Sequence, residues 1–87
     1  MSDKDIRVEI LKILRDFNNN DPYNFLEKEK LRKKFAPTID ENTLNRNVKY
    51  LHDKGFIKAH LFLGGGFIAQ ITADGIDYLE SLDEQKE

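Results

Sequence analysis

The first stretch of the chain has the apolar spacing of an α-helix. Between about residues 3 and 17, apolar side chains recur every three or four positions, at Ile6, Ile10, Ile13, Leu14 and Phe17. Ser2, with Asp5 three residues later, resembles a capping box in which aspartate replaces glutamate. The run NNNDP at residues 18–22 predicts the end of this helix, because asparagine tolerates left-handed backbone and proline cannot continue the hydrogen-bond ladder.

A second, shorter helix is predicted over residues 27–35. The sequence EKEKLRKKF places Leu31 and Phe35 four positions apart among charged residues, which indicates a helix with one narrow buried stripe. The residues before it, 23–26, fit either extended chain or the entry to this helix. Pro37 predicts a break after it, because the residue before a proline is pushed out of the α region.

The third helix has clear signals at both ends. Asp40 is placed to cap its N-terminus, and Ile39 and Leu44 have the spacing of a hydrophobic staple. The core side is predicted to carry Leu44, Val48 and Leu51. Gly55 is expected just past the end of the helix, in the left-handed conformation that favours glycine.

Two β-rich runs follow, FIKAHLF at residues 56–62 and FIAQIT at residues 67–72, and the LGGG between them predicts a hairpin. Strand alternation sends Ile57, Ala59 and Leu61 to one face, so the hairpin is expected to expose apolar surface near its tip. Such a patch more often contacts a protein partner or a dimer mate than DNA. The alternative is that Phe62 and Phe67 pair across the hairpin and shield each other.

A last helix is predicted after the hairpin. Thr72 can cap it, and one side carries the apolar residues Ile76, Leu79 and Leu82. We therefore expect one α+β domain over residues 1–82, with three helices, a β-hairpin and a fourth helix, followed by an acidic C-terminal tail at residues 83–87.

This order of elements is that of a winged helix-turn-helix domain, and two motifs carry a family resemblance. The segment TLNRNVKYLHDKGFI at residues 43–57 resembles the recognition-helix segment of MarR- and PadR-type winged-helix regulators, with Thr43, Arg46 and Gly55 at matching positions. Residues 71–75, ITADG, are similar to the motif that closes the wing and opens the last helix in many of these domains. The longer run ITADGIDYLE is similar to the ending of short YjcQ-type winged-helix proteins. The resemblance implies a DNA-binding regulator, although a winged helix that binds only protein needs the same core positions.

Charge is distributed unevenly along the 87 residues. The net charge is −2, yet residues 27–58 contain nine basic and five acidic side chains, while acidic residues gather at the C-terminus. There is no cysteine, which excludes disulfides and thiolate-bound zinc. The N-terminus is charged and no window approaches the roughly 18 apolar residues of a membrane span, so we expect a cytoplasmic protein with no membrane segment.

The outward side of the third helix is the candidate DNA-reading surface. At about 100° per residue, Asn42, Arg46 and Lys49 lie nearly opposite the core side, with Asn45 and Tyr50 on the flanks. Arg46 could contact guanine through two hydrogen bonds, either asparagine could pair with adenine, and Lys49 could reach phosphate. The alternative is that this is the solvated face of a surface helix.

The second helix supplies candidate phosphate contacts: Lys28, Lys30, Arg32, Lys33 and Lys34. A charge run on a short helix can equally be a solvent-facing surface. The DNA-binding residues that we predict are Asn42, Thr43, Asn45, Arg46, Lys49, Tyr50, Lys30, Lys33 and Lys34.

No catalytic, metal or cofactor site is indicated. His52 and His60 lie on different elements without further ligand spacing. The glycines at residues 64–66 join two strands and lack the motifs of a phosphate-binding loop. Serine hydroxyls occur only at Ser2 and Ser81, near the two ends of the chain.

The sequence therefore predicts a small transcriptional regulator that binds double-stranded DNA. A homodimer is expected, because one recognition helix reads only a few base pairs. The alternative is a winged helix used for protein–protein association, through the apolar hairpin at residues 62–67 and the acidic last helix.

Overall fold

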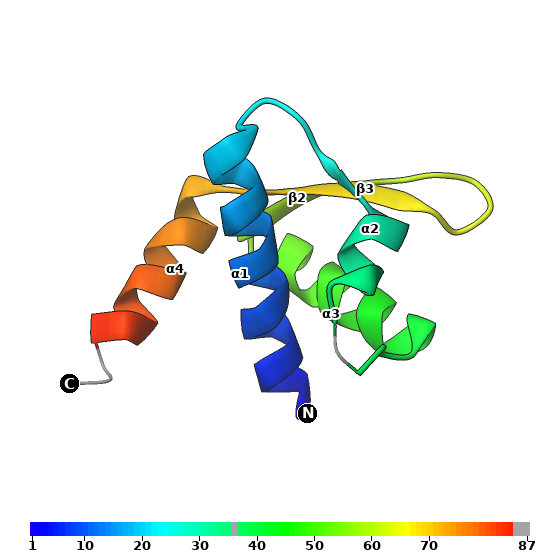
Figure 1. Ribbon diagram of the computed structural model, residues 1–87, viewed down its shortest axis with the longest axis horizontal. Helices are drawn as coiled ribbons and strands as arrows, with labels where there is room; N and C mark the ends of the chain where they lie inside the picture. Colours follow the sequence, from blue (N-terminus) through cyan, green and yellow to red (C-terminus); the bar gives the residue numbers. More distant parts are fainter. Residues whose placement is uncertain (36, 85–87) are drawn as a thin grey trace.

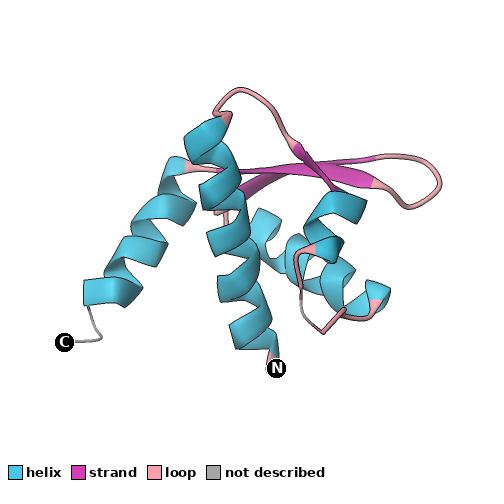
Figure 2. Ribbon diagram, in the orientation of Figure 1, coloured by secondary structure: helices cyan, strands magenta, loops and turns pink. Residues whose placement is uncertain are grey.

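The computed structural model describes residues 1–35 and 37–84, which form four helices and a three-stranded antiparallel sheet (Figures 1 and 2). The elements follow in the order α1 (Asp3–Asn20), β1 (Leu26–Glu27), α2 (Lys28–Lys33), α3 (Glu41–Asp53), β2 (Ile57–Leu61), β3 (Phe67–Ile71) and α4 (Ala73–Glu84). Helix α1 lies between α4 on one side and α2 and α3 on the other, and the sheet runs across one end of the helices (Figure 1). Among these residues no helix is both long and apolar enough to cross a membrane.

Helix α1 begins as predicted but ends later. The Ser2 hydroxyl accepts the Asp5 backbone N–H at 3.2 Å, which confirms the N-cap. The helix continues to Asn20 because the asparagine run supports its last turn: the Asn20 side chain donates to the Asp16 carbonyl at 3.1 Å. The predicted end near Phe17 was therefore three residues too early. Asp21 then closes the helix with an N–H that donates to the Phe17 carbonyl at 2.9 Å.

The segment whose conformation the sequence left open leads into a strand. Leu26 pairs with Ala69 and Glu27 with Ile68, so β1 joins the hairpin and β3 becomes the central strand, in the order β1-β3-β2. Leu26 is buried in the core, which explains the pairing. A strand of two residues is too short to show a period-2 pattern, and the sequence analysis missed it.

Helix α2 is shorter at both ends than the predicted 27–35, because Glu27 belongs to β1 and the helix ends at Lys33, but the predicted core residues of this segment and of α3 are confirmed. Leu31 and Phe35 are buried, as are Leu44, Val48 and Leu51. The Asp40 carboxylate caps α3 by accepting the Thr43 N–H at 3.1 Å. Gly55 has φ +80, and the Phe56 N–H donates to the Leu51 carbonyl at 3.0 Å, which is the 6→1 bond of a Schellman C-cap.

The hairpin exposes its tip, as predicted. Leu61, Phe62 and Leu63 are 78%, 53% and 105% exposed. Phe67 lies opposite Leu61 rather than Phe62, and its side chain is buried in the core. The alternative in which two phenylalanines shield each other across the hairpin is therefore wrong.

Helix α4 packs on α1, and its N-terminus is fixed to the turn that follows α3. The Thr72 hydroxyl accepts the Gly75 N–H at 3.2 Å and donates to the Gly55 carbonyl at 2.7 Å, so one side chain caps α4 and ties it to the turn after α3. Leu79 is buried, and Ile76 and Leu82 pack against the core. The helix extends two residues into the segment expected to be a tail, and residues 85–87 of that segment lie outside the described residues.

Candidate nucleic-acid interface on helix α3

Helix α3 has an outward side that carries four of the nine predicted DNA-contacting residues. Asn42, Asn45, Arg46 and Lys49 are all exposed there, and the buried residues Leu44, Val48 and Leu51 hold the opposite side against the core. The helix is therefore firmly seated, with a row of amide and cationic groups facing away from the protein.

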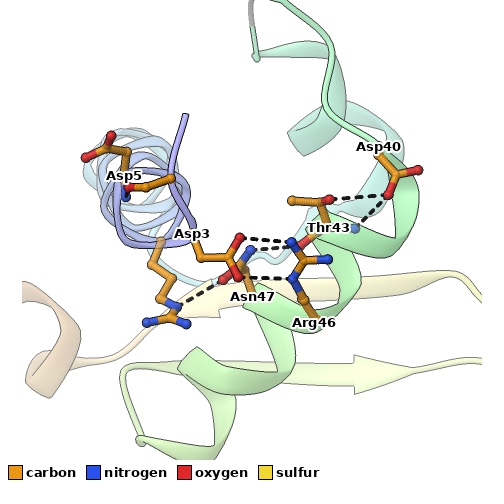
Figure 3. Close-up of polar contacts among 8 residues, drawn as sticks. Asp3, Asp5, Asp40, Thr43, Arg46 and Asn47 are labelled. Atoms are coloured by element: carbon orange, nitrogen blue, oxygen red, sulfur yellow. Dashed lines mark hydrogen bonds and ion pairs between the residues drawn. The ribbon is translucent and has the colours of Figure 1, made fainter.

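Arg46 does not extend freely into solvent, because α1 holds it. Its Nε donates to Asp3 Oδ2 at 3.1 Å and its Nη2 donates to Asp3 Oδ1 at 2.9 Å, so the guanidinium and the carboxylate form a two-point contact (Figure 3). Hydrogen bonding to Arg46 lowers the pKa of Asp3, and the same contact raises the pKa of Arg46. The Asp3 carboxylate occupies the donor fork that guanine or a phosphate would need.

The contact between α1 and α3 continues through a buried asparagine that sequence analysis did not select. Asn47 is 1% exposed; its Oδ1 accepts from Arg7 Nε at 2.9 Å and its Nδ2 donates to the Thr43 carbonyl at 2.9 Å (Figure 3). The Arg7 guanidinium lies 3.7 Å from the centre of the Tyr50 ring. A helical wheel could have shown this, since Asn47 falls beside Leu44 and Leu51 on the core side.

These contacts change the assignment of two predicted site residues. Tyr50 is covered on one ring face by Arg7, and Thr43 is half-buried with its hydroxyl donating to Asp40 at 3.2 Å. Thr43 therefore helps to cap the helix, and Tyr50 contacts α1 through one ring face and remains 39% exposed.

Lys49 is paired on the surface of α3 itself. Its ammonium donates to Asp53 at 2.7 Å, one helical turn later, and this hydrogen bond lowers the pKa of Asp53. Both side chains are more than half exposed, so water screens the attraction and the pair can open.

The second helix contributes fewer free cations than its sequence suggested. Lys30, Lys33 and Lys34 are exposed, as a phosphate-contacting role requires. Lys28 is only 5% exposed, and its ammonium contacts the Glu41 carboxylate and donates to the Gly65 carbonyl at 2.8 Å. Arg32 donates to the Ile39 carbonyl at 3.2 Å. Lys28 is therefore buried away from any phosphate, which contradicts its predicted phosphate contact, whereas Arg32 is half-buried and its predicted phosphate contact stays a prediction.

A groove of about 480 Å³ separates α3 from the hairpin. One wall carries polar side chains of α3, Asn45, Lys49, His52 and Asp53, and the other carries apolar hairpin residues, Ala59, Leu61, Phe62 and Phe67. The outward side of α3 is thus continuous with an apolar surface.

The described part of the chain holds no cluster of three or more potential metal ligands. Each shifted pKa belongs to a residue of an ion pair: Asp3 and Arg46 pair with each other, Glu41 pairs with the buried Lys28, and Asp53 pairs with Lys49. Comparison of the chain with protein-family models, with curated proteins and with solved structures finds no significant match.

Proposed function

We propose that this chain is a small winged helix-turn-helix protein that binds double-stranded DNA with α3 in the major groove. The observation that carries the proposal is the outward side of α3, where Asn42, Asn45, Arg46 and Lys49 are exposed on a helix anchored from behind. Asparagine and arginine are the side chains that pair with the edges of adenine and guanine. The order of the elements and the β2–β3 hairpin beside α3 support the same assignment.

Phosphate contacts come from α2 in this proposal. Lys30, Lys33 and Lys34 are exposed on α2 and at its C-terminal end, and in this proposal they fix the register of α3 on the duplex. Because one helix reads only a few base pairs, the proposal includes two copies on adjacent half-sites.

Two cations of the proposed site are paired with carboxylates of the protein, so each must exchange its partner when DNA binds. Arg46 must leave Asp3 and Lys49 must leave Asp53 before either cation reaches DNA. Both pairs are exposed, so solvent weakens them and phosphate can compete. We therefore expect binding of modest affinity with strong dependence on salt concentration.

Titration of duplex DNA at low salt, followed by mobility shift and by amide chemical shifts, tests the proposal. Arg46→Ala should lower the affinity for the preferred DNA sequence by roughly 5- to 150-fold, which is the loss expected for one two-point base contact. Arg15→Ala is the matched control, because Arg15 contacts Asp16 on α1 and lies outside the proposed interface. Absence of binding by the unaltered chain, or equal losses in the two variants, would rule out groove reading by α3.

A second candidate function, protein–protein association through the hairpin, is favoured by one observation. Leu61, Phe62 and Leu63 form an exposed apolar tip, and this stretch and the rest of the hairpin from Ala59 to Gln70 contain no arginine or lysine to contact DNA. Chemical-shift changes at the tip with a protein partner, together with no change along α3 on adding DNA, would support this function instead.

A further inference from the structure

A buried lysine contacts the turn at the tip of the hairpin. Lys28, at the start of α2, donates to the carbonyl of Gly65 in the turn, and the same ammonium pairs with Glu41 at the start of α3. The ammonium also lies 5.9 Å from the centre of the Phe67 ring. Three elements therefore meet at one side chain, and the apolar tip is presented from a fixed base.

Carboxylates border this apolar tip. A hollow beside the turn is lined by Phe62 and residues 64–66 on one side and by Glu27, Glu29 and Glu41 on the other. Glu27 and Glu29 are exposed, while the charge of Lys28 is engaged by Glu41. The border on the α2 side is therefore negative. On the α3 side, Leu61 and Phe62 share a groove with Lys49 and Asp53, whose charges pair with each other.

This arrangement restricts what can cover the tip. DNA phosphates would be repelled by Glu27 and Glu29, because bringing like charges together raises the electrostatic energy. A second copy joined tip to tip would bring the same two carboxylates of each chain toward each other. A segment with apolar side chains and cationic neighbours satisfies both features, because it covers the apolar surface and pairs with the carboxylates.

We propose that Leu61, Phe62 and Leu63 form a docking site for a protein segment in which apolar side chains alternate with lysine or arginine. The apolar side chains of the segment cover the tip, and its cations face Glu27 and Glu29. This site lies apart from the proposed DNA-reading side of α3, and it rests on the second candidate function, since it names the chemistry of the protein segment that the tip binds.

Two synthetic ten-residue peptides probe the site, one of alternating leucine and lysine and one of alternating leucine and glutamate. Added to the full chain at physiological salt, the lysine peptide should shift the amide signals of Leu61, Phe62, Leu63 and Glu29, whereas the glutamate peptide should not. Leu63→Ser should lower the affinity for the lysine peptide roughly tenfold or more, because the burial of one leucine side chain is lost. Replacing Glu27 and Glu29 together by glutamine should weaken binding and reduce its salt dependence.

Tyr23→Ser is the matched control, because Tyr23 is 90% exposed but precedes β1, outside the tip. This variant should bind the lysine peptide as the unaltered chain does, and thermal melting should show that both serine variants remain folded.

Several results would overturn the proposal. Equal binding of the two peptides would show that Glu27 and Glu29 do not select a cationic segment. Shifts confined to the acidic residues of α4 would show electrostatic attraction without docking at the tip. Concentration-dependent dimers in sedimentation experiments that Leu63→Ser abolishes would identify a second copy as the occupant. Shifts at the tip with duplex DNA alone would identify DNA. None of these results depends on Arg46, so the test stands apart from that of DNA binding.

Discussion

Replacing Gly75 by alanine tests how closely α4 approaches the turn after α3. A Cβ atom built on Gly75 lies 2.2 Å from the Phe56 carbonyl oxygen and 2.8 Å from Cγ1 of Ile71, both below the 3.0 Å that real Cβ contacts respect. The Phe56 carbonyl also accepts the Thr72 N–H at 3.0 Å, so it cannot retreat without straining that bond. The added methyl group must therefore push the first turn of α4 away from the core.

Two opposing effects set the size of the change. Alanine in place of glycine within a helix stabilises by roughly 0.5–1 kcal/mol. Overfilling a closed contact costs about 1–3 kcal/mol, and a weakened backbone hydrogen bond adds about 1 kcal/mol. Because the closest atom belongs to the backbone and has little freedom to move, we expect the cost to prevail, with a net loss of about 1–3 kcal/mol. For a domain of this size the melting temperature should fall by roughly 5–20 °C.

Thermal and urea unfolding followed by circular dichroism measure this loss. Gly66→Ala is the matched control, because a Cβ atom there meets only Phe62 Cδ2, at 3.9 Å, and the backbone of Gly66 is not left-handed. We expect the free energy of unfolding of this control variant to lie within about 0.5 kcal/mol of that of the unaltered chain. If Gly75→Ala and Gly66→Ala have the same melting temperature and the same urea midpoint, α4 does not contact Phe56 as described.

Three further predictions concern α3 and its contact with α1. Leu44→Ala should cost about 2–5 kcal/mol in urea unfolding, because Leu44 is fully buried, whereas Asn45→Ala should be nearly neutral. Gly55→Val should cost about 1–2 kcal/mol because φ is +80, although the space is open; unfolding equal to the unaltered chain would argue against the C-cap. Arg46 lowers the pKa of Asp3, so their contact stabilises at neutral pH and this contribution is lost as the pH falls through about 3.9 and below. Asp3→Asn should therefore destabilise the chain at pH 7, and this effect should shrink as the pH is lowered below about 3.9; an effect that does not change with pH would show that the pair is absent in solution.

The elements that sequence analysis located are those with local causes. The capping residues Ser2, Asp40 and Thr72 act on backbone groups three residues away, so their patterns are visible in the sequence and the structure contains all three caps. The C-cap at Gly55 is local in the same way. Strand β1 was not predicted because it exists only through pairing with β3, which lies more than forty residues later in the chain.

The candidate site shows the same limit more sharply. A helical wheel gives the direction of the Cβ atom, and it placed Arg46 correctly on the outward side of α3. It does not say where the end of a long side chain lies, and Asp3, which holds that end, is forty-three residues away in the sequence. Charge alone likewise suggested that Lys28 would face solvent, whereas Glu41 and the Gly65 carbonyl allow it to be buried.

The buried Lys28 joins the two surfaces that we assign to different partners. Its ammonium contacts Glu41 in the first turn of α3, and it also contacts the Gly65 carbonyl in the hairpin turn. The start of the proposed DNA-reading helix and the proposed protein-docking tip therefore share one fixed point. A partner that displaces the hairpin turn would break the hydrogen bond from Lys28 to the Gly65 carbonyl. The buried ammonium would then have only Glu41 as an acceptor, so a change at the tip alters the ion pair that contacts α3. If both surfaces are used, occupation of one should change the affinity of the other, and by linkage the effect must be equal in both directions.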